Sequence, residues 1–278
     1  MNLEPKHPST TAPLNRRSVL ITGASSGIGE AFAEVFAQAG FDLVITARRE
    51  DRLEAVAARL SQRHGSRVEV IAADLADPNA PERLCRELQA RGLTIDALVN
   101  NAGYGIPGAF AASDWPRHAA LIQVMVTTAA ELTHRLVPGM VARGYGRIIN
   151  VASLAALVPA PAGHTLYAAC KAFLVKFSES LGDEVRSSGV HVTALCPGFT
   201  LSEFHDVIGT RATVRNLPGW MWMDAATVAR QGFEAVMAGS SVYVTGRVNR
   251  TIAFLARHLP RGLVLALGRG TAWRYRRN

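Results

Sequence analysis

The chain of 278 residues contains few cysteines and no long apolar segment. Its three cysteines show no paired spacing, which favours free thiols in a reducing compartment over a disulfide framework. The first seventeen residues lack the apolar core of a secretory signal, so we expect a cytoplasmic protein with a flexible arm over residues 1–17. The apolar run 262–268 is far too short to span a bilayer. We predict no metal site.

Acidic residues are missing from the C-terminal part of the chain. Residues 247–278, here called the basic tail, contain eight arginines and no Asp or Glu. Residues 1–246 hold 22 basic and 22 acidic residues, so the whole net charge of +8 lies in the basic tail. The hydrophobic content of 49% and the charged content of 19% are typical of a globular protein.

Short apolar strands alternate with amphipathic helices between residues 18 and 246. We expect strands at 18–22, 41–47, 67–72, 95–100, 146–153, 190–195 and 241–245. We expect helices at 28–39, 50–64, 81–91, 114–141 with a bend near Pro138, 164–187 and 224–237, and an irregular segment at 199–223. This alternation predicts one α/β domain over 18–246, a single doubly wound parallel sheet (Rossmann-like) with helices on both faces.

A glycine-rich turn, Thr22-Gly-Ala-Ser-Ser-Gly-Ile-Gly29, joins the first expected strand to a helix. Glycines let backbone N–H groups approach a phosphate, and the helix N-terminus adds positive potential. The spacing differs from the GxGxxG of the standard dinucleotide fingerprint, and an ordinary turn is the alternative. The predicted cofactor-binding residues here are Gly23, Ser25, Ser26, Gly27, Ile28 and Gly29.

The second expected strand ends at Arg48-Arg49, and no Asp or Glu occurs from Leu43 to Arg49. In nicotinamide-binding folds an acid near this strand end bonds the ribose 2′-hydroxyl, whereas an arginine pairs with a 2′-phosphate. We therefore predict that Arg48 binds the phosphate and that NADP(H) is preferred over NAD(H). The alternative is that Arg48 is a solvated charge at the strand end.

A tyrosine and a lysine lie one helical turn apart in Tyr167-Ala-Ala-Cys-Lys171. An ammonium beside a phenol favours the phenolate, so the pair predicts a lowered pKa for Tyr167. Such a phenol can exchange a proton near neutral pH. Because this spacing is common on helix surfaces, the other motifs decide what it means.

Together these motifs resemble the classical short-chain dehydrogenase/reductase family over about residues 18–246. The matching residues occur in the family's order and spacing: Thr22–Gly29, Asp74, Asn100-Asn-Ala-Gly103, Ser153, Tyr167, Lys171 and Pro197-Gly198. The resemblance implies an oxidoreductase that interconverts a carbonyl and an alcohol on a small-molecule substrate. It also implies a homo-oligomer, because dimers and tetramers are usual in the family.

The resemblance implies a role for each of these residues. Tyr167 would be the general acid/base, Lys171 would tune it and hold the nicotinamide ribose, and Ser153 would bind the substrate oxygen. The further implied cofactor contacts are Asp74, Leu75, Asn101, Ala102, Gly103, Pro197, Gly198, Thr200 and Ser202.

One position departs from the family pattern. In Gln123-Val-Met-Val-Thr127, Met125 stands where the family has a catalytic Asn. Methionine cannot hold the water that links the lysine to solvent in the family's proton relay, and Gln123 lies on a different helical face. Another water path, a slow enzyme and an inactive site are the alternatives. The presence of Ser153, Tyr167 and Lys171 favours an active enzyme.

Two segments bear on substrate and partners. Residues 199–223 lie where the family has its substrate lid, and their apolar side chains indicate either a hydrophobic substrate or ordinary packing. Residues 249–259 and 261–268 are expected to form two short amphipathic helices. Their apolar side could contact an anionic membrane peripherally through 249–268, or pack on the domain or a second subunit. No motif predicts specific nucleic-acid recognition.

Two other functions stay open at this point. A non-catalytic NADP(H)-binding sensor or scaffold on the same fold would account for Met125. A peripheral-membrane lipid-modifying reductase would account for the basic tail. The first predicts cofactor binding without turnover, and the second predicts that deletion of 249–278 abolishes binding to anionic vesicles.

Overall fold

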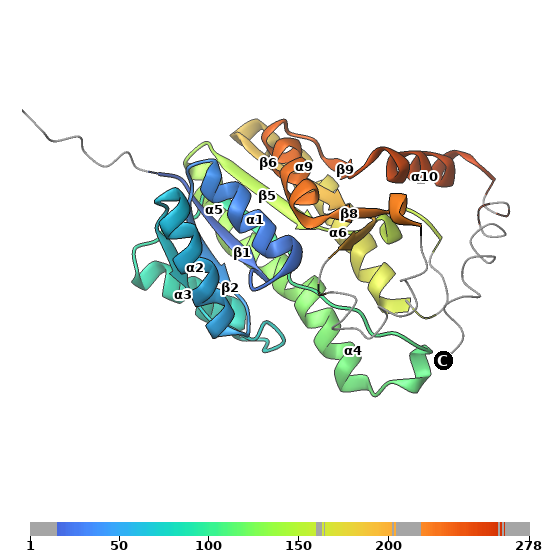
Figure 1. Ribbon diagram of the computed structural model, residues 1–278, viewed down its shortest axis with the longest axis horizontal. Coiled ribbons are helices and arrows are strands. Elements are labelled where there is room, and N and C mark those ends of the chain that lie inside the picture. Colours follow the sequence, from blue (N-terminus) through green and yellow to red (C-terminus); the bar gives the residue numbers. More distant parts are fainter. Residues whose placement is uncertain are drawn as a thin grey trace, which may run out of the picture.

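Seven parallel strands form one central sheet in the order β3-β2-β1-β4-β5-β6-β9, with helices on both faces (Figure 1). The computed structural model describes residues 16–159, 163, 165–201, 203, 218–260, 262 and 264. The strands of this sheet are β1 (Ser18–Thr22), β2 (Asp42–Thr46), β3 (Val68–Val70), β4 (Ala97–Asn100), β5 (Gly146–Val151), β6 (Val190–Cys196) and β9 (Val242–Val244). The predicted doubly wound fold is confirmed.

The helices are α1 (Gly27–Gln38), α2 (Glu50–His64), α3 (Ala80–Ala90), α4 (Trp115–Ile122), α5 (Thr128–Ala142), α6 (Thr165–Val185), α9 (Ala225–Met237) and α10 (Arg247–His258). Two large apolar clusters join helices to opposite faces of the sheet. One cluster joins Phe32 of α1, Leu53 of α2 and Val228 of α9 to the sheet. The other joins Leu84 of α3 and Leu132 of α5 to the opposite face. Both faces of the sheet are therefore covered, as parallel sheets require.

Four elements differ from the expectation. A π-helix at Gln123–Thr127 joins α4 to α5, and it is here, rather than at Pro138 inside α5, that the long helix is irregular. Its wider turn places the neighbouring residues Val124 and Met125 both in the interior. Residues 199–223 are not wholly irregular, because β7 (Phe199–Leu201) and β8 (Trp222–Asp224) pair in parallel. The tail helix begins at Arg247 instead of 249, while residues 261–268 lie largely outside the described ones.

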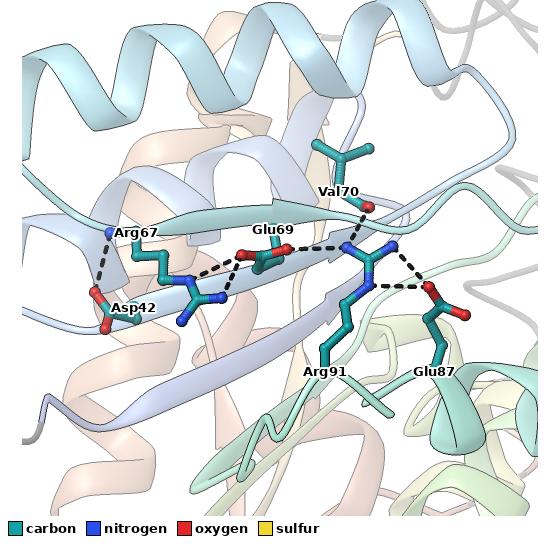
Figure 2. Close-up of polar contacts among 6 residues, drawn as sticks. All are labelled: Asp42, Arg67, Glu69, Val70, Glu87 and Arg91. Atoms are coloured by element: carbon teal, nitrogen blue, oxygen red, sulfur yellow. Dashed lines mark hydrogen bonds and ion pairs between the residues drawn. The ribbon is translucent and has the colours of Figure 1, made fainter. Parts of the chain in front are cut away.

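The edge strand β3 is short and carries a chain of ion pairs on its polar side (Figure 2). Glu69 accepts from Arg67 at 2.8 Å and from Arg91 at 2.9 Å, and Arg91 also reaches Glu87. These contacts tie β3 to the end of α3. Both arginines hold the pKa of Glu69 below its usual value, Arg67 first. Charges along an edge also discourage pairing with another chain.

A buried polar network joins the middle strands to the helices below the candidate site. The Asn100 amide donates to Thr133 Oγ1 at 3.0 Å and to Asn150 Oδ1 at 2.8 Å. The Asn150 amide in turn donates to Ser178 Oγ at 2.8 Å. These bonds connect β4, β5, α5 and α6. They hold the ends of β4 and β5 in a fixed position relative to α6, the helix that carries Tyr167 and Lys171.

Candidate active site

The structure brings Ser153, Tyr167 and Lys171 together just beyond the carboxyl end of β5. Ser153 follows β5 by two residues, while Tyr167 and Lys171 lie one turn apart on α6. The buried Lys171 ammonium donates to the Val151 carbonyl at 2.6 Å, which holds α6 against the strand end. The Ser153 side chain is hydrogen-bonded to the Tyr167 phenol. Open α/β sheets bind ligands at this edge.

Burial dominates the protonation of both α6 residues. It raises the pKa of the Tyr167 phenol, and the hydrogen bond with Ser153 offsets only part of that rise. This direction is the reverse of the one that the Tyr–Lys spacing predicts. The reason is that the Lys171 ammonium lies 5.7 Å from the centre of the Tyr167 ring and is itself desolvated. Burial lowers the pKa of Lys171 from 10.5 to about 8.

The glycine loop between β1 and α1 fits a phosphate. Gly23 and Gly27 have φ of +67° and +62°, which only glycine adopts readily. A Cβ on Gly29 would lie 2.2 Å from the Gly23 carbonyl oxygen, so a side chain there cannot be accommodated. Helix α1 begins at Gly27, after the extended Ser26. The first N–H groups of a helix, here from Gly27 and Ile28 onward, have no acceptor within the helix and can bind an anion.

Thr22 joins this loop to the turn after β4. Its hydroxyl accepts from the backbone N–H groups of Asn101 and Ala102, both at 3.0 Å. The Asn101 amide donates to the carbonyls of Thr22 and Gly23 at 2.9 and 3.2 Å. Two of the predicted cofactor segments therefore form one rigid unit along the strand ends.

The side chains of Met125 and Lys171 both lie next to Gly103. A Cβ on Gly103 would lie 3.3 Å from Met125 Cγ and 3.6 Å from Lys171 Nζ. Met125 is buried in an apolar cluster, so it offers Lys171 no hydrogen-bonding group. The Gln123 amide donates instead to Thr128 Oγ1 at 3.3 Å, in agreement with the expectation that Gln123 is a poor substitute.

The two adjacent arginines after β2, Arg48 and Arg49, lie in different environments. Arg48 is exposed and lies close to Tyr104. Burial raises the pKa of the Tyr104 phenol, the charge of Arg48 offsets part of that rise, and the charge of Asp74 adds to it. The exposed Asp74 accepts from the Ala76 N–H at 3.0 Å. Leu75 is buried, and its carbonyl accepts from Thr128 Oγ1 at 3.1 Å.

Arg49, which the sequence analysis did not single out, contacts the glycine loop directly. Its Nη2 donates to Ser25 Oγ and Ser26 Oγ, both at 3.1 Å. Its other nitrogen pairs with Glu203 at 3.2 Å. The doublet Arg48-Arg49 was the sequence signal for this contact. Adjacent residues at a strand end face different sides, so one of the two arginines can face the glycine loop.

The turn after β6 lies beside Ser153. The Leu154 N–H donates to the Pro197 carbonyl at 2.8 Å, and the buried Thr200 donates to the Gly198 carbonyl at 3.2 Å. A Cβ on Gly198 would lie 2.5 Å from the side chain of Asn249, so α10 starts against this turn. The predicted Ser202 lies outside the described residues.

A small cavity adjoins Tyr167, and its walls are both apolar and polar. They are formed by Ile106, Gly108, Ala109, Phe110, His118, Leu121, Thr165, Leu166 and Tyr167. An apolar substrate wall was expected in 199–223, of which 202 and 204–217 lie outside the described residues. The wall from 106–121 was not predicted, and its only signal was an apolar stretch after Gly103.

Comparison with known proteins decides the family. The sequence profile of the short chain dehydrogenases matches residues 17–212. The chain belongs to the short-chain dehydrogenase family. It is 37% identical over 191 residues to sulfoacetaldehyde reductase 2 of Chromohalobacter salexigens, which covers 67% of this chain and 73% of that protein. Relatives named as dehydrogenases and reductases do not favour a non-catalytic sensor.

Solved structures agree with this assignment. A short-chain dehydrogenase from Sphingobium yanoikuyae in complex with NADPH has a TM-score of 0.77 and 33% identity, covering 89% of this chain and 94% of that one. A bulky-bulky ketone specific alcohol dehydrogenase from Comamonas testosteroni has a TM-score of 0.73 and 29% identity, covering 90% and 94%. The protein is therefore an oxidoreductase of the short-chain dehydrogenase family that acts on CH–OH groups with a nicotinamide cofactor.

Within the part of the chain that the structure describes, no His, Cys, Asp and Glu side chains gather into a metal-binding group. None of the described helices is long and apolar enough to cross a membrane.

Proposed function

We propose that this enzyme interconverts a carbonyl and an alcohol on a hydrophobic substrate, with NADP(H) as cofactor and Tyr167 as general acid/base. The observation that carries the proposal is the meeting of Ser153, Tyr167 and Lys171 beyond β5, next to the glycine loop. When bound, the cofactor supplies or accepts the hydride.

The protein side chains supply the proton and the oxygen-binding groups. The raised pKa of Tyr167 keeps its phenol protonated at neutral pH, so it can donate to a carbonyl oxygen. Ser153 donates a second hydrogen bond to the same oxygen and stabilises the developing alkoxide. Lys171 is mostly protonated below about pH 8, and its charge helps the phenol release its proton.

The residues around the loop fit a nicotinamide dinucleotide with a 2′-phosphate. Backbone N–H groups at Gly27 and Gly29 would hold the pyrophosphate, and Asp74 would contact the adenine. Arg48 and Arg49 would pair with the 2′-phosphate. The NADPH bound to the Sphingobium yanoikuyae relative supports this choice of cofactor.

A hydrophobic substrate is supported by the bulky ketones named for the Comamonas testosteroni relative and by the aliphatic and aromatic side chains among the walls of the cavity beside Tyr167. The cavity has one ionisable wall residue besides Tyr167. This is the buried His118, whose Nε2 lies 3.0 Å from the Phe110 carbonyl oxygen. A ketone flanked by apolar groups suits these walls better than a charged substrate.

The test follows NADPH oxidation with a panel of aldehydes and bulky ketones. We expect turnover in the wild type, a loss of at least about 100-fold in Tyr167→Phe, and little change in the control Tyr243→Phe on β9. Turnover that survives Tyr167→Phe would remove Tyr167 from the mechanism. NADPH binding without turnover on any compound would revive the sensor hypothesis.

We also propose that α10 contacts an anionic membrane surface. Its packed side consists of the buried Asn249 and the half-buried Ile252, Ala253 and Ala256, while Val248, Phe254 and Leu255 are 39%, 60% and 45% exposed. Arginines stand beside these apolar groups, and the helix has no acid. Two like-charged copies would repel each other here, whereas an anionic lipid surface satisfies both the apolar and the basic groups.

Vesicle flotation tests this contact. We expect binding to vesicles that contain phosphatidylserine but not to pure phosphatidylcholine, and weaker binding of Phe254→Glu. The matched control Val141→Glu, on an exposed apolar residue of α5, should bind like the wild type. Equal binding of both variants would exclude α10 as the contact.

A further inference from the structure

The carboxylate of Glu203 bridges two arginines beside the glycine loop. Glu203 Oε1 lies 2.7 Å from Arg52 Nη1, and Oε2 lies 3.2 Å from Arg49 Nη1. The two arginines stand at the start of α2, whereas Glu203 lies just beyond β7, about 150 residues later in the chain. This is a specific long-range contact, since one carboxylate satisfies two cations that would otherwise repel each other.

Arg49 is fully engaged by this arrangement. One of its terminal nitrogens faces Glu203, and the other donates to the hydroxyls of Ser25 and Ser26. An arginine fork of this kind binds carboxylates and phosphates by the same hydrogen-bonding geometry. The anion that Arg49 holds here therefore belongs to the protein itself, at the place where the proposed function puts the 2′-phosphate.

We propose that Glu203 competes with the 2′-phosphate of the cofactor for Arg49, and so determines how strongly the enzyme distinguishes NADPH from NADH. This inference rests on the proposed NADP(H) site. A phosphate bound at Arg49 and the serine hydroxyls would stand next to the Glu203 carboxylate. Because a phosphate carries about −1.5 to −2 charge, the two anions repel each other, and one must leave Arg49.

The competition has a structural consequence. Arg52 gives Glu203 a second partner at 2.7 Å, so the carboxylate can leave Arg49 without losing both of its ion pairs. Binding of a 2′-phosphate is thereby coupled to the position of the Glu203 side chain. A nucleotide without that phosphate leaves the Arg49–Glu203 pair intact. The two arginines, Arg52 first, also keep the pKa of Glu203 low, so the carboxylate stays charged at neutral pH.

Calorimetry with nucleotide fragments tests this without requiring turnover. Adenosine 2′,5′-bisphosphate carries the 2′-phosphate, and 5′-AMP does not. Both are titrated into the full chain as wild type, as Glu203→Gln and as the control Glu54→Gln. The double variant Arg49→Gln/Glu203→Gln is compared with Arg49→Gln. Glu54 is exposed on α2, two residues after Arg52 in the sequence, so Glu54→Gln controls for the general loss of a negative charge.

We expect Glu203→Gln to bind the bisphosphate about 1.5- to 5-fold more tightly than the wild type, which is the range of partly exposed ion pairs. Affinity for 5′-AMP should not change, and the gain should shrink in high salt. In the Arg49→Gln background the same substitution should give little gain. Unchanged or weaker bisphosphate binding in Glu203→Gln, or an equal gain in Glu54→Gln, would overturn the proposal.

The proposed function fails in a different way. A wild type that binds the bisphosphate no better than 5′-AMP, together with variants that behave alike, would contradict the 2′-phosphate site itself. Tight bisphosphate binding with no effect of Glu203→Gln would leave the NADP(H) site standing and exclude only the competition.

Discussion

At the residue scale, Lys171 is a buried ammonium group that donates to the carbonyl of Val151 at 2.6 Å. A buried cation with a single neutral partner lowers stability, because water solvates it better. The lowered pKa of about 8 expresses that cost. Such a cost is expected where a charge serves catalysis rather than folding.

The cost in stability of burying the Lys171 ammonium depends on pH. Between about pH 8 and 10.5 the unfolded chain binds more protons at Lys171 than the folded protein, so folded stability rises with pH. Lys171→Met should remove that dependence. The difference in unfolding free energy between Lys171→Met and the wild type should shrink by about 2 kcal/mol from pH 7 to pH 9.5.

Urea unfolding at the two pH values measures this difference. Lys176→Met on the exposed side of the same helix is the control, and its difference from the wild type should not follow pH in this way. Lys171→Met should also lose turnover. A constant difference across the pH range would show that Lys171 keeps its ordinary pKa in the fold.

At the element scale, the start of α1 depends on a close approach of two backbone segments. A Cβ on Gly29 would lie 2.2 Å from the Gly23 carbonyl and 2.5 Å from the Asn101 amide. Gly29→Ala should therefore displace the loop, destabilise the protein by about 1–3 kcal/mol and weaken NADPH binding at least about tenfold. Fluorescence titration with NADPH and thermal unfolding measure both effects.

Gly139 in α5 is the matched control, because it is also a helical glycine. Its added Cβ would meet only the flexible end of Arg143, at 3.1 Å. Gly139→Ala should keep NADPH affinity and add about 0.5–1 kcal/mol of stability through helix propensity. If Gly29→Ala bound NADPH as well as Gly139→Ala did, the loop would not be the phosphate site.

The π-helix at Gln123–Thr127 raises a separate question about Met125. Its side chain fills the space between Gly103 and Lys171 without a polar contact that could serve a proton relay. Met125→Leu preserves volume and apolar character, so turnover should stay within about twofold and stability within about 1.5 kcal/mol. A large loss of turnover in Met125→Leu, with unchanged unfolding, would give the thioether a role.

These elements also show which features of the structure could be predicted from the sequence. Alternating apolar strands and helices, and motifs at strand ends, were enough to predict the sheet, α2 at 50–64 and the N-cap of α9 at Asp224. The π-helix was not predictable, because no local pattern in Gln123–Thr127 distinguishes it from the α-helix on either side. Arg49 and Glu203 were missed because their pairing joins segments about 150 residues apart.

At the scale of the whole molecule, the two edges of the sheet differ in chemistry. The β3 edge carries paired charges that disfavour association, as Figure 2 shows. The β9 edge leads into the basic helix α10. Helix α6 presents a third surface, where Phe173 is 38% exposed and stacks on Phe177 with ring centres 5.6 Å apart. Exposed aromatic pairs of this kind are typical of protein interfaces.

We propose that this α6 surface joins two copies of the chain across a two-fold axis. In such an interface the same patch meets itself, so each Phe173 would contact the partner's aromatic pair. The neighbouring Lys176 and Glu179 form an ion pair and leave no net charge to oppose this contact. The homo-oligomer implied by the family resemblance would then bury the stacked rings, whereas α10 would stay free for the membrane.

Phe173→Glu should therefore halve the mass measured by light scattering after size-exclusion chromatography. The reason is that each interface would bury two carboxylates among aromatic rings, at a cost of several kcal/mol. Phe254→Glu, which places the same charge on an exposed aromatic of α10, should leave the mass unchanged. A monomeric wild type, or a loss of mass in Phe254→Glu instead, would place the interface elsewhere and make α10 the contact between copies.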